Sequence, residues 1–379
     1  MHIAWRKHQS GTRLPPTKAL ALLRKAVEAD PDKPEIRLVL AQVLFECDCI
    51  GEIADLLSAK ITEAPAPQAD FHVGRAASHL GHFADAIPPL RRAADAGIAR
   101  ARGELATALW RSGDSEGALA VARAALETDP NDIAPLRVLG HILLAQGRAK
   151  DAYDRARSLW SRGAHGTQVV WTWAAAACAL GREEEYRRLA APQPWFAQTR
   201  LDIDNVALAK AILDNRALSA SQSYKPAKGG VLRLDDFDSA EDRAAAAFHE
   251  SLRGKISRYL ADRAQLDHPL IVGRPEKMSL ESWALVMDDN GVEDWHIHAA
   301  AWLSGVYYIR TPGTRAGAGN IAFGALPLAA KVARCTIPEW SVAPEPGTLL
   351  LFPSWFAHRT WPTGTADKRI SIAFNTLAA

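Results

Sequence analysis

Glycines recur at a nearly constant spacing in the first half of this 379-residue chain. Four of them stand 32, 34 and 34 residues apart, and each closes a run with a helical pattern: Gly81, Gly113, Gly147 and Gly181. Five residues after each of the first three comes an alanine, and after the fourth a tyrosine: Ala86, Ala118, Ala152 and Tyr186. A fixed period of this length indicates an array of helix pairs in which each repeat contacts only its neighbours.

Each residue of the period has a physical role. Glycine permits the tight turn between two helices, and alanine lets the helices approach closely. Asp30-Pro31 and Asp129-Pro130 end helices where repeat boundaries are expected. The pattern resembles the tetratricopeptide repeat, although the large aromatic residue early in each repeat is mostly missing. We predict four to five such repeats over residues 17–190, in a domain that spans residues 1–195.

Two roles for the array stay open at this point. The helices cap and stabilise the second half of the chain, or their concave surface binds a protein or peptide partner, as extended repeat surfaces commonly do. The array also contains four histidines whose spacing does not converge on one metal: His72, His79, His82 and His141. We expect these to be surface or packing residues.

Composition narrows the class of protein. The net charge is only +2, so electrostatics predicts neither nucleic acid nor a membrane surface as a partner. No run approaches about 18 apolar residues, and residues 1–7 lack the apolar core of a secretory signal. The four cysteines fit neither a disulfide framework nor a zinc knuckle, which predicts a reducing, cytoplasmic location. The oligomeric state is not readable.

The pattern changes after residue 195. A short helix is expected over residues 204–215 and an amphipathic one over 239–264, flanking a sheet. From Ser282 onward, short β-rich runs alternate with Gly, Pro, Asn and Asp. Such runs without long helices between them predict an antiparallel sandwich or jelly roll, here in a domain of residues 196–379.

A pair of histidines opens the chemical interpretation of this second half. Side chains alternate along an extended strand, so His296 and His298 point the same way, and Asp294 shares their face. A third imidazole, His358, lies on a separate strand-like run. A redox-active metal held on one side by protein requires such a set.

The last predicted strand carries a cation on an inward face. Arg369, Ser371, Ala373 and Asn375 share one face, opposite apolar side chains such as Ile372. A buried arginine is costly unless it meets an anion. We therefore expect Arg369 to bind a carboxylate ligand, which a planar guanidinium can do in a bidentate manner.

Three segments together resemble a 2-oxoglutarate/Fe(II)-dependent oxygenase of the bacterial and phage branch related to prolyl hydroxylases. They run from His296 to Tyr308, from Pro346 to Ser354, and from His358 to Asn375. The resemblance covers residues 200–379 and implies a double-stranded β-helix that uses Fe(II) and 2-oxoglutarate. It implies His296 and His358 as metal ligands, and Arg369, Ser371, Tyr308 and Asn375 as co-substrate residues. The implied reaction converts 2-oxoglutarate to succinate and oxidises, usually hydroxylates, a C–H bond.

The chain departs from the family pattern at one position. The usual triad is two histidines and a carboxylate, but the residue two after His296 is His298. Three interpretations stay open. His298 is the third ligand, His298 lies outside the metal's ligand set, or Asp294 supplies a carboxylate in reversed order.

Three functions follow from these patterns. The first is an oxygenase, a hydroxylase, whose repeats recruit a protein or peptide substrate. The second is a cupin-like, three-histidine metalloenzyme without 2-oxoglutarate, which would have no need for the carboxylate clamp at Arg369. The third is a non-catalytic repeat adaptor with a vestigial barrel.

Overall fold

The structure is a computed structural model that describes residues 4–5, 16–31, 33–58, 66–98, 100–221, 225–235, 237, 243–312 and 317–378. The chain divides into two compact units. The first is Thr12–Gln146, and the second is Gly147–Ala379 together with strand β1 (Ala4–Trp5). This division assigns the last helices of the repeat region to the second unit, whereas the predicted domain boundary after residue 195 stays a prediction.

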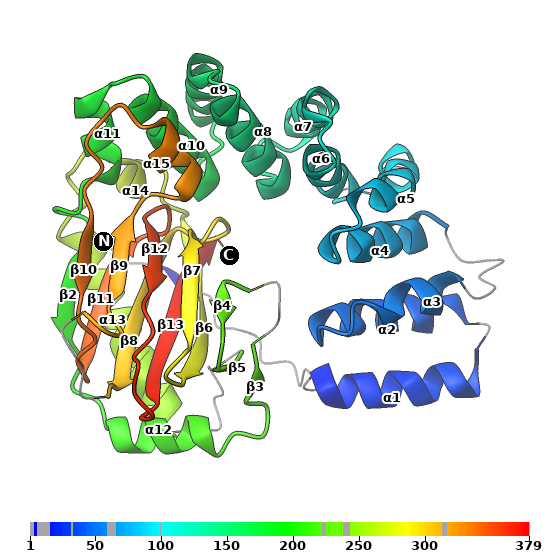
Figure 1. Ribbon diagram of the computed structural model, residues 1–379. Helices are drawn as coiled ribbons and strands as arrows, with labels where there is room; N and C mark the ends of the chain where they lie inside the picture. The colour runs from blue at the N-terminus through cyan, green and yellow to red at the C-terminus, as the bar shows by residue number, and fades with distance from the viewer. Residues whose placement is uncertain are drawn as a thin grey trace. The chain divides into compact units, whose positions relative to one another are not determined.

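The first unit consists of helices that pack on their neighbours along the chain (Figure 1). They are α1 (Pro16–Ala29), α2 (Pro34–Glu46), α3 (Glu52–Ser58), α4 (Ala66–His79), α5 (Phe83–Asp95), α6 (Ala101–Arg111), α7 (Ser115–Thr128) and α8 (Ile133–Ala145). Gly81 and Gly113 stand at interhelical turns with φ of +84° and +101°, which side-chain-bearing residues rarely adopt. Ala86 and Ala118 are fully buried between helices. The predicted helical repeats are confirmed.

The described residues of the second unit contain seven further helices. They are α9 (Ala149–Ser161), α10 (Thr167–Ala179), α11 (Glu183–Ala190), α12 (Asn205–Leu213), α13 (Arg243–Ala261), α14 (Pro269–Val272) and α15 (Pro327–Val332). Asp204 caps α12 by accepting hydrogen bonds from two backbone N–H groups. Helix α13 packs on a sheet through Phe248, whose ring centroid lies 5.3 Å from that of Tyr307. The two helices expected to flank the sheet are therefore present.

The strands form two sheets. They are β2 (Ala197–Arg200), β3 (Ser219–Ala220), β4 (Ala227–Lys228), β5 (Val231–Leu234), β6 (Lys277–Met287), β7 (Val292–His296), β8 (Leu303–Arg310), β9 (Ile321–Gly324), β10 (Trp340–Val342), β11 (Thr348–Pro353), β12 (Ala357–Thr360) and β13 (Arg369–Ala378). One sheet has the order β2-β11-β8-β13-β6-β5-β3, with β1 beside β6, and the other has the order β10-β9-β12-β7-β4.

Strands β6 to β13 define the fold. Four of them form β11-β8-β13-β6 in the first sheet, and the other four form β10-β9-β12-β7 in the second. All pairs among them are antiparallel, and the chain passes between the sheets repeatedly. This is the double-stranded β-helix, or jelly roll, that the sequence predicts.

Strand β13 is central because it pairs with both β6 and β8. Its apolar face buries Ile370, Ile372 and Phe374 completely. Its other face turns Arg369 and Ser371 toward a cavity between the two sheets. The alternation predicted for this strand is therefore correct at these positions.

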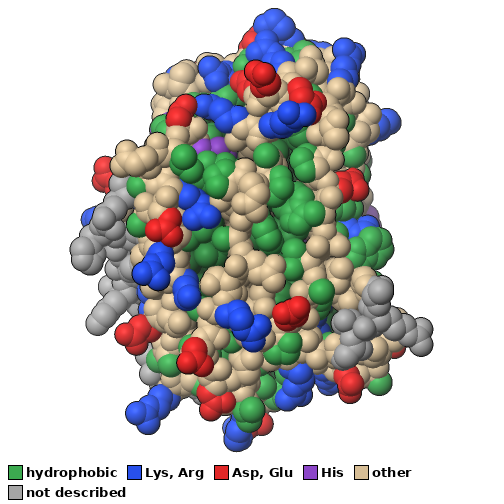
Figure 2. All heavy atoms as spheres, turned by 90° about the vertical axis from the view of Figure 1, so that its left-hand side faces the viewer, with side chains coloured by type: hydrophobic (Ala, Val, Ile, Leu, Met, Phe, Trp, Pro, Cys, Tyr) green, Lys and Arg blue, Asp and Glu red, His purple; other side chains and the backbone are tan. Residues whose placement is uncertain are grey.

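The surface on the β2 side of the second unit has mixed charge. Basic and acidic side chains surround an apolar centre (Figure 2). No described helix is long and apolar enough to cross a bilayer. All four cysteines are free thiols, and the cytoplasmic location stays a prediction.

Gly305 on β8 provides a test of this packing. A Cβ at this position would lie 2.2 Å from the Leu350 carbonyl oxygen and 2.4 Å from the Phe374 ring. We expect Gly305→Ala to lower the free energy of unfolding by about 1–3 kcal/mol through overpacking, measured by chemical denaturation. The matched control is Gly254→Ala on α13, where the new methyl meets nothing within 4 Å. That change should stabilise the protein by about 0.5–1 kcal/mol. Equal effects at the two sites would contradict the packing described.

Candidate functional site

Three imidazoles converge at the cavity between the sheets. His296 ends β7, and antiparallel pairing places His358 of β12 opposite it. His298 follows β7 and is held by a hydrogen bond of 3.0 Å from its backbone N–H to the Ser354 carbonyl. One ring nitrogen from each histidine lies within 4.8 Å of those from the other two. The structure therefore brings together the three predicted metal ligands.

Backbone carbonyls orient two of these rings. The Nδ1 of His296 lies 2.6 Å from the Asp294 carbonyl oxygen, and the Nδ1 of His358 lies 2.9 Å from that of Phe356. A carbonyl oxygen only accepts, so each Nδ1 carries a proton, and in a neutral ring the Nε2 then holds the lone pair. The Nε2 atoms of His298 and His358 are 3.2 Å apart. Rings fixed in this tautomer suit a metal bound through Nε2.

Burial favours the neutral form of two of the three imidazoles. Burial, and then the neighbouring His358, lower the pKa of His298 well below its usual value. Burial, and then His296, lower the pKa of His358 in the same way. Neutral imidazoles at neutral pH are ready to coordinate a cation without first losing a proton.

A β-bulge decides which acidic residue reaches the cavity. His358 pairs with His296 and Thr360 with Glu293, so β7 holds one more residue than β12 between these pairs. The extra residue turns Glu293 to the side of His296, where both line the cavity. Asp294 is exposed, and it joins no cluster of metal-binding side chains among the described residues. The expectation that Asp294 shares the histidines' face is wrong.

The cavity has an empty volume of about 420 Å³, counted to the solvent at its mouth. The predicted residues Arg369, Ser371 and Tyr308 line it together with the three histidines. The remaining wall is mainly apolar, and includes Leu285, Met287, Val306, Ile321, Phe352 and Ala373. Such a wall excludes water and strengthens electrostatic interactions inside the cavity.

Arg369 is a buried cation that lacks a carboxylate partner in the described part of the chain. It is 1% exposed, and its Nη1 donates to the Gly319 carbonyl oxygen at 2.7 Å. Its Nη2 contacts the Met287 sulfur, while its Nε has no hydrogen-bond partner among the described residues. Burial lowers the pKa of Arg369, whereas the charges of Tyr308 and Glu293 raise it. The Tyr308 hydroxyl is also buried without a hydrogen-bond partner in the described chain.

Asn375 lies outside the cavity. Its Oδ1 accepts a hydrogen bond of 2.8 Å from Ser304, whose hydroxyl lies 2.7 Å from that of Ser354. This buried chain of polar groups ends at the residue whose carbonyl holds the His298 backbone. Asn375 keeps the face predicted for it but lies beyond Ala373, past the end of the cavity. The structure therefore does not bring this predicted co-substrate residue to the site.

Two family models match the chain. Residues 281–375 match the one described as "Putative 2OG-Fe(II) oxygenase". Residues 73–133 and 104–164 match the tetratricopeptide repeat. Both matches confirm the resemblances found in the sequence. A search of curated proteins found no match.

Several solved structures are similar to parts of this chain. A Pseudomonas putida prolyl-4-hydroxylase is 14% identical, with 50% of this chain and 95% of that chain covered and a TM-score of 0.35. MamA from Desulfovibrio magneticus RS-1 is 18% identical, with 38% and 84% covered and a TM-score of 0.35. YrrB, described as a TPR protein with an unusual peptide-binding site, is 17% identical, with 44% and 88% covered and a TM-score of 0.34.

Proposed function

We propose that this chain, which joins tetratricopeptide repeats to a domain of a 2OG-Fe(II) oxygenase family, is an Fe(II)- and 2-oxoglutarate-dependent hydroxylase of a protein or peptide. One observation carries the proposal. The cavity that holds three imidazoles also holds a buried guanidinium and a phenol, each with a polar atom that has no partner among the described residues. A metal and a carboxylate-bearing co-substrate together account for both halves of that cavity.

The cavity residues would have two different roles, metal binding and co-substrate binding. His296, His298 and His358 would hold the iron through their Nε2 atoms. Arg369 would bind the far carboxylate of 2-oxoglutarate, with Ser371 and Tyr308 donating hydrogen bonds beside it. Ser371 and Tyr308 are direct neighbours on paired strands, which supports this grouping. With iron and 2-oxoglutarate bound, dioxygen would be the oxidant: one oxygen atom would enter the C–H bond to give an alcohol, and the other would enter succinate as 2-oxoglutarate loses CO2.

A three-histidine enzyme without 2-oxoglutarate is the second candidate. Among the described residues, the cluster of three histidines includes no carboxylate, which favours this second candidate. The Glu293 carboxylate, which acts on Arg369 through its charge, also supplies some of the anionic field that a co-substrate would otherwise provide. Binding of 2-oxoglutarate separates the two candidates.

Substrate recruitment is assigned to the repeats of the first unit. A surface pocket there lies between α6, α7 and α8, and charged side chains of both signs line it. They are Arg100, Arg102, Arg137, Glu104, Asp129 and Asp132. A pocket lined by charges of both signs suits a peptide, because a peptide backbone offers both donors and acceptors.

The first prediction concerns the anion clamp. Arg369→Ala should weaken 2-oxoglutarate binding by about 30-fold or more, corresponding to about 2 kcal/mol or more, while Fe(II) binding persists. Anaerobic calorimetry with each ligand measures both. The matched control is Arg310→Ala, because Arg310 is exposed on β8 beside the same strand. Unchanged 2-oxoglutarate affinity in Arg369→Ala would remove the clamp and favour the second candidate.

The second prediction concerns the metal ligands. His358→Ala should abolish stoichiometric Fe(II) binding, and the exposed His82→Ala should leave it intact. His298→Ala distinguishes a ligand from a supporting residue. If His298 is a ligand, His298→Ala should abolish stoichiometric Fe(II) binding as His358→Ala does. If His298 only supports the ligands, His298→Ala should weaken Fe(II) affinity by only about 10–100-fold. Retained stoichiometric iron in His358→Ala would exclude it as a ligand.

The third prediction concerns recruitment. Peptides selected from a random library on the full-length protein should increase succinate formation by the wild-type enzyme. Arg137→Ala should weaken binding of the same peptides and leave basal 2-oxoglutarate turnover unchanged, because it lies in the repeats. Peptides that bind equally well to Arg137→Ala, or that bind without stimulating turnover, would contradict recruitment through this pocket.

A further inference from the structure

A third residue that lines the cavity carries a buried polar atom with no partner among the described residues. Trp283 of β6 is 6% exposed and lines the cavity with Leu285 and Met287 of the same strand. Its indole Nε1–H has no hydrogen-bond partner in the described residues. Two nearby indoles do have one, since Trp302 donates to the Leu270 carbonyl at 3.0 Å and Trp355 to that of Leu189 at 2.8 Å. Trp340 is also unpaired, but it does not line this cavity.

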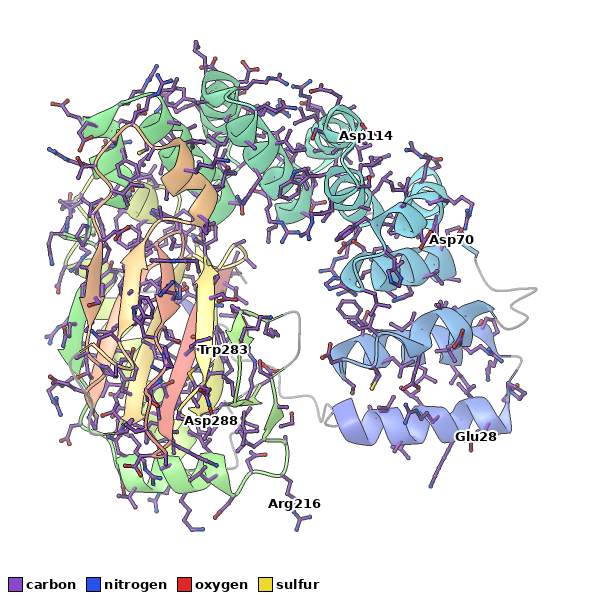
Figure 3. The ribbon with its side chains drawn as sticks, in the orientation of Figure 1. Glu28, Asp70, Asp114, Arg216, Trp283 and Asp288 are labelled. Carbon is purple, nitrogen blue, oxygen red and sulfur yellow. The ribbon has the colours of Figure 1, made fainter. Side chains whose placement is uncertain are left out.

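Trp283 lies at the end of the cavity opposite to the anion clamp. Strand register places Trp283 beside Ala373, and Met287 beside Arg369. Four residues of extended strand separate these positions by about 13 Å. The Trp283 ring is instead close to the metal cluster, 5.8 Å from the His298 ring between centroids. Figure 3 shows Trp283 on β6, with Asp288 just beyond the end of the same strand. A co-substrate held at Arg369 therefore leaves this indole unexplained.

The indole is held in place by a cation. The Arg233 guanidinium carbon lies 4.6 Å from the centroid of the Trp283 ring, and its Nε donates to Asp235 at 2.6 Å. Arg233 is itself 8% exposed. A buried cation–π stack of this kind resists rotation of the ring. The N–H is thus fixed, and leaving it unpaired is unfavourable until an acceptor arrives.

We infer that the Trp283 indole N–H binds the substrate by donating a hydrogen bond to a backbone carbonyl oxygen next to the carbon that is oxidised. The inference rests on the proposed function, because it assigns the metal end of the cavity to the substrate. An indole N–H only donates, so it selects a group that accepts. The apolar side chains around it exclude competing water. Substrates that lack an acceptor at this place should be discriminated against, because the N–H would remain unpaired.

The test observes the indole directly. Full-length protein with 15N-labelled tryptophan is loaded with diamagnetic Zn(II) in place of Fe(II), saturated with 2-oxoglutarate, and titrated with N-methylacetamide as a minimal peptide group. The Trp283 resonance is assigned by its loss in Trp283→Phe, which keeps an aromatic ring over Arg233. We expect this N–H resonance to move downfield and to saturate. Trp302 and Trp355, whose N–H groups are already bonded, serve as internal controls and should not move.

The outcomes separate this inference from the proposed function. If Zn(II) and 2-oxoglutarate bind but the Trp283 resonance does not shift, or shifts only as much as the control resonances, the inference is overturned and the proposed function is not. Failure to bind 2-oxoglutarate overturns the proposed function and this inference with it. With the library-selected peptides, Trp283→Phe should raise KM about 5- to 30-fold, as one lost hydrogen bond implies, at unchanged 2-oxoglutarate affinity. An unchanged KM counts against the inference.

Discussion

The antiparallel pairing of β7 with β12 is the interaction on which the site depends. It places His358 opposite His296, although 62 positions separate them in the chain. A slip of one residue would turn one imidazole to the outside of the sheet. Register is secured because β12 also pairs with β9 on its other edge. Phe352 and Phe323 then pack against the His358 ring, with centroids 4.9 and 5.8 Å away. The convergence of His296 and His358 thus results from sheet formation.

The polar groups without partners among the described residues differ between the two ends of the cavity. Arg369 and Tyr308 lie toward one end, where the proposed co-substrate would bind, and the histidines lie toward the other. Trp283 extends this order, because its ring lies beside the ring of His298 and its N–H has no partner among the described residues. Burying such groups lowers stability before any ligand binds. Their concentration in one cavity is therefore better explained by ligand binding than by stability.

The last helices of the repeat region are packed differently from the earlier ones. Helix α10 keeps the repeat pattern, yet all of its 13 residues are buried. Trp355 of the sheet region donates to Leu189 of α11, and Thr167 of α10 donates to the Ala301 carbonyl. The last repeat is therefore built into the second unit, which is one of the two roles that the sequence left open. The earlier repeats remain available for the other role.

The sequence by itself determined the repeat period, the order of the two regions, the double-stranded β-helix and the convergence of His296, His298, His358 and Arg369. The repeat period, the order of the regions and the inward face of Arg369 follow from spacing, alternation and the cost of burying charge. The double-stranded β-helix and the convergence of the histidines with Arg369 were implied by the resemblance to a known family. The tertiary structure alone decided that Glu293 reaches the cavity instead of Asp294, because a bulge adds one residue to a strand and reverses the parity on which alternation depends. It also placed Asn375 beyond the cavity and Trp283 inside it. A strand's face can be read from its residues, but how far a cavity extends along that face depends on the opposite sheet.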